Sequence, residues 1–536
     1  MEDRGTLEAG LKSDRFTGYD RLSSEGGYKA SALMKGTSVL EVVTATEVNE
    51  IVHLLMPFKN GLGAVPLGVA TKVLFNSLYA VFSLAPSLIG RIVVNTSGLV
   101  FFNMIKDPEM QASFGVYDGY YFVFYFALIT ALLDKFSIEM SVAFGEKNYS
   151  KIKDIFTKSG LVCLTLFLLV ILPMMGFSSL ILTTMGISSD IASVVQDTTR
   201  LSIPLIAINM LSEYIKGFCL SQGHEKVFGY TSLASLTATI IANYFVIVKY
   251  KYGIHGWIYT KTANEFLTLI VTIVVYLNAV PESRGFVSLS TAMKGLGIFF
   301  YESMKFTFGL YPECLGFELT GFFVALTDNT DQIAAYYCAV NVTSLNFCLG
   351  FAFAIICRTR MNILLGMGEH QAAKNYFKFY VIFNMIVGGI IGLILYLCRE
   401  FLVTIYSDST EGMKQWFFKL LLIYTIVAST EISMNTIMIC MKSIGKIGIL
   451  LILSLMFPLV GNLVGGLAIH HYGLGCDFQF GNYMALCASL TILCLIIGLR
   501  SDWSKALKDN EKENKVLNLQ AHASVNRASR SLVRHE

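Results

Sequence analysis

The sequence predicts an all-α integral membrane protein with twelve transmembrane helices in two six-helix lobes. Three observations predict this fold: too little charge for a water-soluble protein, a series of twelve apolar segments, and an internal repeat that relates the two halves. Of 536 residues, 54% are hydrophobic and only 15% are charged, whereas about a quarter of the residues of a soluble protein are charged. The missing charge indicates that lipid replaces water as the solvent along much of the chain.

Twelve apolar segments lie between polar breaks. Each is long enough to cross a bilayer, which takes about 20 mostly apolar residues at a rise of about 1.5 Å per residue. The predicted spans are 73–105, 114–143, 155–180, 195–220, 228–249, 256–280, 297–326, 333–363, 376–398, 415–440, 447–469 and 480–499.

These spans divide the chain into two lobes with polar flanks. Residues 1–66 are predicted to be a cytosolic, mostly disordered tail, 67–280 the N-lobe, 281–296 a cytosolic loop, 297–499 the C-lobe and 500–536 a second cytosolic tail. Basic residues in the predicted loops number 13 on the side of the tails and 5 on the other side. Because cytosolic loops carry the excess of Lys and Arg, both termini are predicted to face the cytosol. The plasma membrane and a vacuolar or other endomembrane stay open as locations.

Composition also excludes several classes of function. The 41 basic and 38 acidic residues leave a net charge of +3, too balanced for a nucleic-acid-binding surface. The 11 cysteines form no C-x-x-C pair, so neither a metal site nor a disulfide framework is predicted. No Walker A sequence occurs, which argues against an ATP-driven pump. The chain is therefore predicted to be neither an enzyme nor dependent on a cofactor.

The two halves carry the same landmarks in the same order. Three short matches recur at helix ends with a nearly constant offset: Gly145 matches Gly366, 221–223 matches 443–445, and 252–256 matches 472–475. Six spans return the chain to its starting side, so the second copy has the same orientation as the first. Such a parallel repeat is typical of transporters, in which two lobes enclose a central cavity and alternate its access.

Three carboxylates lie at bilayer depth in the second half: Glu313, Glu318 and Glu431. An ionisable side chain there costs roughly 2.5–3.5 kcal/mol, so each is a candidate functional group. Glu313 and Glu318 belong to the seventh span, and their separation along it places them about 140° apart on a helix. One is expected to line the cavity and the other to pack against a neighbouring helix or polar group, and the sequence leaves open which is which.

The seventh span also contains residues that weaken helices. Pro312 cannot donate a backbone hydrogen bond, and Gly309 and Gly316 lie close to it. Two interpretations stay open: a bend that exposes backbone groups to a ligand in the cavity, or a kink that serves packing alone.

Other polar residues within the spans are candidates for lining the cavity. Arg91 has no local partner, and pairing with Glu213 or with a seventh-span carboxylate stays open. Lys135 with Glu139 and Glu213 with Lys216 are predicted to form structural pairs, because residues three or four apart are neighbours on a helix. The candidate cavity-lining residues are Asn95, Arg91, Tyr311, Asn341 and Asn435.

Acidic groups in one lobe predict an exchange mechanism. A buried carboxylate binds either a proton or a cationic substrate, because an unpaired charge in lipid is costly. Mutually exclusive binding predicts antiport: export of an organic cation or another small amphipathic compound in exchange for protons, with sodium as an open alternative. The partners implied are a small-molecule substrate and the bilayer, with the protein acting as a monomer.

At these residues the sequence resembles the multidrug and toxic compound extrusion (MATE) family of secondary transporters, over roughly residues 73–507. The resemblance implies that Glu313, Glu318 and Glu431 recognise cations and couple to protons. The motifs that carry it are Glu313 and Glu318, spaced as in C-x-E-W-W-x-[FY]-E; 358–361 followed by Gly366, like S-T-R-V-x-N-x-L-G; and Glu431 followed by 442–445, like a tenth-helix Glu and R-G-x-G.

The sequence departs from the family pattern at three places. The two tryptophans of the seventh-helix motif are replaced within 314–316, Phe101 stands where prokaryotic members carry a first-helix Asp, and 137–145 differs from the second-helix motif D-T-x-x-x-Q-x-x-G. The chain is therefore identified as a divergent, eukaryotic-type member, and an N-lobe proton site of the prokaryotic type is not expected.

Two alternative functions stay open. A cavity dominated by Arg91, Lys72 and Lys305 would favour a transporter of organic anions or lipid-linked compounds on the same fold. A channel or receptor would require an oligomeric pore or a ligand-binding ectodomain. The short outer loops leave no room for an ectodomain.

Overall fold

The computed structural model describes residues 52–105, 108–184, 187, 189–278, 281–309, 311–327, 329–406 and 411–504. These residues are almost entirely helical, and no strand occurs among them. Ten of their helices are long and apolar enough to cross a membrane. The fifth predicted span appears as a shorter apolar helix, Ser235–Lys249. The seventh predicted span is divided into two helices, α14 and α15. The predicted number of twelve spans is therefore not directly confirmed.

The first half begins with short turns and continues in long helices. Its elements are η1 (Met56–Asn60), η2 (Leu62–Ala64), α3 (Leu67–Ile105), α4 (Pro108–Tyr121), η3 (Phe122–Ala127), α5 (Leu128–Gly145), α6 (Tyr149–Leu166), η4 (Phe167–Ile171), α7 (Leu172–Gly176), α8 (Ser178–Thr184), α9 (Ser189–Leu201), α10 (Ile203–Ser221), α11 (Glu225–Asn243), η5 (Tyr244–Lys249) and α12 (Gly253–Leu277).

The connection and the second half follow the same plan. Their elements are η6 (Pro281–Ser283), α13 (Leu289–Ala292), α14 (Leu296–Phe308), α15 (Tyr311–Ala325), α16 (Thr330–Gly366), α17 (His370–Leu397), α18 (Arg399–Tyr406), α19 (Glu411–Ser443), α20 (Ile447–Ser454), η7 (Leu455–Gly461), α21 (Asn462–His471) and α22 (Cys476–Arg500).

Local sequence explains where two of the long helices begin. The side chain of Asn148 accepts a hydrogen bond from the backbone N–H of Lys151 at 3.1 Å and so caps α6. Asn329 accepts the equivalent bond from Gln332, also at 3.1 Å, and caps α16. Asparagine is favoured at this position because its side-chain oxygen satisfies a backbone N–H that has no partner within the helix.

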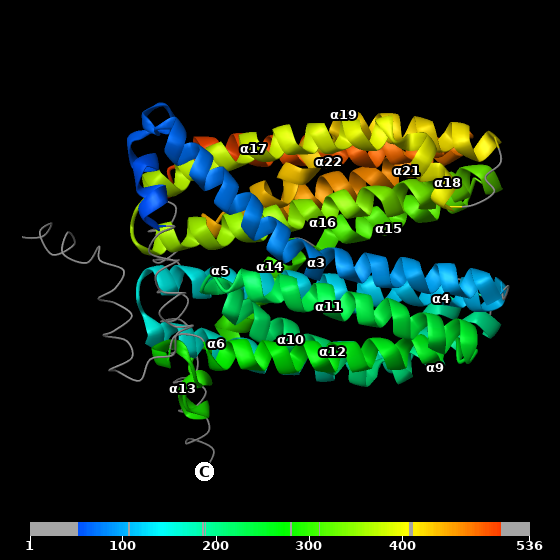
Figure 1. Ribbon diagram of the computed structural model, residues 1–536, viewed down its shortest axis with the longest axis horizontal. Coiled ribbons are helices and arrows are strands. Elements are labelled where there is room, and N and C mark those ends of the chain that lie inside the picture. The colour runs from blue at the N-terminus through cyan, green and yellow to red at the C-terminus, as the bar shows by residue number, and fades with distance from the viewer. Residues whose placement is uncertain are drawn as a thin grey trace, which may run out of the picture.

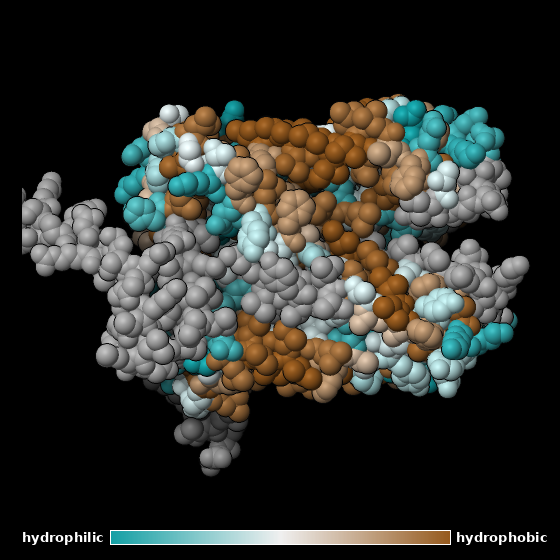
Figure 2. Space-filling model, viewed as in Figure 1, coloured by the Kyte–Doolittle hydropathy of each residue, from teal (hydrophilic) through white to brown (hydrophobic). Residues whose placement is uncertain are grey.

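The helices form two bundles that lie side by side with their axes roughly parallel (Figure 1). One bundle contains α4, α5, α10 and α12, and the other contains α15, α17, α19 and α22. Figure 2 shows apolar side chains in the middle of both bundles and hydrophilic ones towards the ends. Exposed leucine and isoleucine side chains are numerous, and lipid is the solvent that accepts such a belt.

The first helix of each half contacts both bundles. α3 packs against α11 of its own half and against α16 of the other, and it crosses the molecule obliquely in Figure 1. α14 packs against α5 and α6 before α15 continues beside α21 and α22. The same crossing in both halves agrees with the internal repeat, and it ties the two lobes together.

The last residues of the predicted N-terminal tail are helical and pack against the C-lobe. Residues 1–51 lie outside the described part. From residue 52 the chain is helical, and Leu55 and Phe58 are buried. Phe58 packs edge-on against Tyr376 of α17 at 5.9 Å between ring centroids, and its carbonyl accepts a bond of 2.8 Å from Asn375. Burial of these apolar side chains stabilises the segment.

The two lobes meet most closely where α5 and α16 end. A Cβ atom at Gly145 would lie 2.3 Å from the carbonyl oxygen of Ile363, and one at Gly366 would lie 2.1 Å from that of Val142. These repeat-related glycines therefore allow a reciprocal backbone contact. This end of the molecule, where Gly145, Gly366 and Ser443 lie, is termed the closed end; the sequence predicts that it faces the cytosol.

Candidate functional site

Glu431 lies in a network of hydrogen bonds inside the C-lobe. The hydroxyl of Tyr424, two turns earlier on α19, donates to its carboxylate. The amide of Asn346 on α16 donates to Glu431 at 3.3 Å and also to the oxygen of Tyr424. Two helices thus hold the carboxylate in one orientation. The sequence analysis did not identify Tyr424 and Asn346, although the two-turn spacing from Tyr424 to Glu431 was visible in it.

Glu313 is buried, with 6% of its surface exposed. Among the described residues it forms no hydrogen bond and no ion pair within 4.0 Å. Its charge interacts with Lys442 and with Glu431. These two residues are eleven positions apart on α19, about 16 Å along the axis at about 1.5 Å per residue, so Glu313 lies at a height between them. A buried carboxylate without a partner is the group that a cationic ligand or a proton would satisfy.

A break in the helix places Glu313 at the start of α15. α14 ends at Phe308 and α15 begins at Tyr311, with Pro312 as its second residue. Proline is tolerated in a first turn because the N–H that it lacks would have no partner there. The predicted weakening of the seventh span is thus an interruption of the helix, and it places Glu313 in the first turn of α15.

Gly316 allows α15 to pack directly on the backbone of η7. A Cβ atom at Gly316 would lie 2.1 Å from the carbonyl oxygen of Pro458, which lies inside this π-helical segment. The amide of Asn462 donates to the carbonyl of Gly316 at 2.8 Å and to Thr320 at 2.9 Å. The position of α15, and with it that of Glu313, is therefore fixed by backbone contact.

Gly316→Ala is expected to destabilise the protein by about 1–3 kcal/mol, the usual cost of forcing extra volume into a packed interior. Gly321→Ala on the same helix is the matched control, because its nearest neighbour would lie at 3.6 Å. Thermal unfolding in detergent, followed by intrinsic fluorescence, measures the difference. Equal midpoints for the two variants would contradict the packing described here.

Glu318 and Tyr311 lie on the side of α15 that meets the N-lobe. Glu318 is half-buried, and one of its carboxylate oxygens would lie 4.0 Å from a Cβ atom at Gly119 of α4. The hydroxyl of Tyr311 donates to the carbonyl of Val123 in η3 at 3.1 Å. The two carboxylates of α15 therefore differ in surroundings: Glu313 faces α19, whereas Glu318 approaches α4 of the other lobe.

The remaining predicted cavity residues have diverse positions. Asn435, one turn after Glu431, is buried, and its amide nitrogen has no hydrogen-bond acceptor among the described residues. Asn341 is half-buried on α16, the helix that also carries Asn346. Arg91 and Asn95 belong to α3, but their side chains lie outside the described part of the structure.

The two predicted local ion pairs are present. Lys135 contacts Glu139 at 2.9 Å, and Lys216 contacts Glu213 at 3.1 Å. Both carboxylates of these pairs are more than one third exposed.

A buried ion pair joins the lobes near the closed end. Arg358 of α16 donates to Asp134 of α5, and both side chains are buried. Lys442 lies close enough to interact with Asp134, Arg358 and Glu313, yet its ammonium group makes no hydrogen bond among the described residues. It lies instead over the ring of Phe306 at 4.6 Å. Charged groups thus extend from Glu431 through Glu313 and Lys442 to the interface between the lobes.

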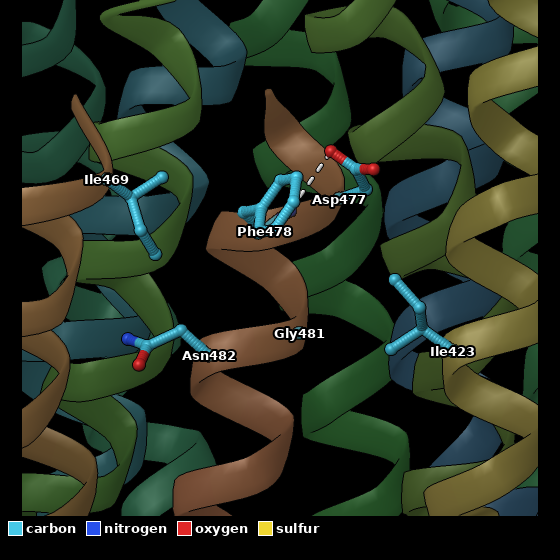
Figure 3. A pocket seen from close by; sticks show the side chains of 6 residues that line it. All are labelled: Ile423, Ile469, Asp477, Phe478, Gly481 and Asn482. Carbon is cyan, nitrogen blue, oxygen red and sulfur yellow. Dashed lines mark hydrogen bonds between the residues drawn. The ribbon is translucent and has the colours of Figure 1, made fainter. Parts of the chain in front are cut away.

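A separate pocket of about 360 Å³ lies at the other end of the C-lobe. Figure 3 shows its lining between α19, α21 and α22, with Asp477 bonded to the backbone N–H of Phe478 at 3.1 Å. Asn482, also in the lining, donates to Asn462 at 3.0 Å, and Asn462 in turn bonds α15. The lining is mostly apolar, and this pocket is distinct from the buried carboxylates.

Comparisons with known proteins agree with this architecture. A family model described as MatE matches residues 87–245. Protein DETOXIFICATION 22 of Arabidopsis thaliana is 26% identical over 269 residues, which is 48% of this chain and 52% of that protein. A probable multidrug resistance protein, NorM, of Halalkalibacterium halodurans is 26% identical over 220 residues, 38% of this chain and 46% of that protein. The matches thus span about half the length of these relatives.

The fold match covers more of the chain. The eukaryotic MATE transporter AtDTX14 has a TM-score of 0.68 at 16% identity and covers 82% of this chain and 99% of its own. A MOP superfamily transporter from Pyrococcus furiosus, described with a binding pocket of reverse polarity, has a TM-score of 0.67 at 13% identity and covers 78% of this chain and 94% of its own. These structural similarities show the fold, and the family match agrees with them.

The chain matches the MATE family over residues 87–245 and shares the fold of MATE transporters over most of its length. It is a multi-pass integral membrane protein, and members of this family are transporters rather than enzymes. The carboxylates that the sequence singles out lie on helices α15 and α19 of the C-lobe, and the charge of Glu431 acts on Glu313.

Proposed function

We propose that this MATE protein is a secondary antiporter that exports organic cations or other small amphipathic compounds in exchange for protons. The observation that carries the proposal is a pair of carboxylates inside the C-lobe, the buried Glu313 and the half-buried Glu431, whose charge acts on Glu313. Glu431 is held by Tyr424 and Asn346, whereas Glu313 has no bonded partner among the described residues. We further propose that the protein acts as a monomer in the plasma membrane or an endomembrane, with both termini in the cytosol.

The chemistry of this pair supports exchange. Two carboxylates close together in a medium of low dielectric constant repel each other when both are charged. A proton or an ammonium group relieves the repulsion, but the two ligands compete for the same oxygens. Competitive occupancy makes the binding of one ligand promote release of the other, and no ATP is required.

Alternating access is supported by the two-lobe architecture. The lobes touch through backbone at the closed end and through the buried pair Asp134–Arg358. Rocking of one lobe against the other would break these contacts and expose the site from that side. The described conformation is then the one in which the closed end blocks passage.

Uptake of ethidium into proteoliposomes under an imposed pH gradient tests the proposal. Wild-type protein is expected to accumulate ethidium when the gradient is applied. Glu313→Gln and Glu431→Gln should each lower the rate about tenfold or more, because interactions with a charged group contribute about 1.5–3 kcal/mol. Glu139→Gln, which removes a carboxylate that is more than one third exposed and pairs only within its own helix, is the control and should keep the wild-type rate.

Parallel measurements distinguish the alternatives. A sodium gradient in place of the pH gradient identifies the coupling ion. Accumulation that does not depend on any gradient, or unchanged rates in both glutamine variants, would contradict the proposed coupling.

A second candidate function is transport of organic anions or lipid-linked compounds. The observation that favours it is the buried ammonium group of Lys442 beside Glu313. Gradient-driven uptake of an anionic dye, with none of ethidium, would establish this function instead.

A further inference from the structure

We infer that the pocket at the end of the C-lobe opposite the closed end is a binding site for a phospholipid with a primary ammonium headgroup, of the phosphatidylethanolamine class. The inference goes beyond the proposed function and does not rest on it. Three features support it: an apolar groove that is open on one side, two opposite charges at one end of this groove, and the depth of these charges in the membrane.

The pocket is a groove along α22 with apolar walls. Its volume is about 360 Å³, and Ile423 of α19 and Ile469 of α21 lie on opposite sides of α22 (Figure 3). Gly481 of α22 also lines it, and the nearest atom to a Cβ atom at Gly481 would belong to Ile423, at 3.9 Å. Phe478, a further lining residue, is 54% exposed, so the groove is open on one side. In a bilayer this side meets lipid, and the groove accepts an acyl chain.

Two opposite charges, Asp477 and Lys419, lie at one end of this groove. Asp477 is part of the lining, and Lys419 lies four residues before Ile423, on the same face of α19. A Cβ atom at Gly475 would lie 2.9 Å from the ring of Trp416 and 3.0 Å from Oδ1 of Asp477. The ammonium group of Lys419 lies 4.2 Å from the centre of the same ring. The carboxylate and the ammonium group are therefore both next to Trp416.

Neither charge is balanced by an ion pair in the described part of the chain. Oδ1 of Asp477 accepts a bond of 3.1 Å from the backbone N–H of Phe478, whereas Oδ2 accepts no bond from a described residue. Asp477 and Lys419 likewise form no ion pair within 4.0 Å, with each other or with another described residue. A ligand that carries both an ammonium group and a phosphate group would satisfy both charges.

The chemistry of these two groups selects the headgroup. A carboxylate oxygen binds a primary ammonium group through a charge-assisted hydrogen bond, which a quaternary choline group cannot donate. Quaternary ammonium groups bind aromatic faces instead, but Lys419 already lies over the ring of Trp416. A glycerol headgroup carries no cation for Asp477. The groove therefore fits phosphatidylethanolamine better than phosphatidylcholine or phosphatidylglycerol.

Asp477 and Trp416 lie at the depth of the lipid headgroups. α22 begins at Cys476 and α19 at Glu411, and both helices are long and apolar enough to cross a membrane. Asp477 is thus in the first turn of one span and Trp416 in the second turn of the other. Tryptophan is enriched at this interface between water and lipid. The acyl chain of a lipid bound at Asp477 would run along the apolar walls of the groove towards the middle of the bilayer.

Native mass spectrometry of the purified full-length protein, titrated with phospholipids of identical acyl chains, tests the site. Wild-type protein is expected to bind phosphatidylethanolamine about fivefold more tightly than phosphatidylcholine or phosphatidylglycerol, as expected of one exposed charged contact. Asp477→Asn should remove this preference, because an amide carries no charge. Lys419→Gln should weaken the binding of all three lipids, since each contains a phosphate group.

Two further variants separate a specific site from general effects. Gly481→Leu fills the groove and should weaken the binding of all three lipids, and thermal unfolding verifies that this variant is folded. Glu411→Gln removes an exposed carboxylate at the same end of α19 and should keep the wild-type preference. The inference would be overturned by equal wild-type affinities for the three lipids, by a preference that persists in Asp477→Asn, or by unchanged binding in folded Gly481→Leu.

Discussion

Replacing Gly366 by alanine is expected to force the two lobes apart at the closed end. A Cβ atom there would lie 2.1 Å from the carbonyl oxygen of Val142, and this atom belongs to backbone that cannot rotate away. Overpacking of this kind costs about 1–3 kcal/mol. This cost destabilises only the conformation in which α5 and α16 touch. The ratio of molecules in this conformation to molecules without the contact should therefore fall by about 5- to 150-fold.

Hydrogen–deuterium exchange measures this change. Amides in residues 142–146 and 363–367 should exchange faster in Gly366→Ala than in wild-type protein, and gradient-driven ethidium uptake should fall. Gly448→Ala, also in a helix near the closed end, is the control because a Cβ atom there meets no atom within 4 Å. Unchanged exchange in Gly366→Ala would mean that the glycine contact does not hold the lobes together.

The same glycines show how much of the fold the sequence predicts. Gly145 and Gly366 could be identified as equivalent positions because the repeat offset can be read from the amino-acid sequence alone. Their reciprocal contact could not, since it depends on how two helices from different halves of the chain cross. The burial of Leu55 and Phe58 could not be predicted for a related reason: it depends on α17, which the chain reaches only in its second half.

In the candidate site, too, contacts within one helix were predictable and contacts between the two halves of the chain were not. The pairs Lys135–Glu139 and Glu213–Lys216 were predictable because helical spacing alone makes them neighbours. The partner of Asp134 was not, since Arg358 belongs to the other half of the chain.

The pair Asp134–Arg358 should be the strongest charged contact between the lobes. Removing one partner of a buried ion pair costs about 3–5 kcal/mol, because the other charge stays buried and uncompensated. Asp134→Asn leaves two buried cations, Arg358 and Lys442, without this carboxylate. Arg358→Gln leaves Asp134 with Lys442 beside it. Asp134→Asn is therefore expected to disturb the closed end more than Arg358→Gln does.

Two measurements rank these variants: hydrogen–deuterium exchange at residues 142–146 and 363–367, and the midpoint of thermal unfolding. We expect Asp134→Asn to show the fastest exchange and the lowest midpoint, Arg358→Gln to be intermediate, and Asp154→Asn to match wild-type protein. Asp154 pairs with Lys158 at 2.7 Å within α6, so its loss breaks no contact between the lobes. The double variant Arg358→Gln with Lys442→Gln should exchange faster and unfold at a lower temperature than Arg358→Gln alone, because Asp134 then has no nearby cation to take the place of Arg358. If the double variant behaves like Arg358→Gln alone, Lys442 does not take part in holding the lobes together.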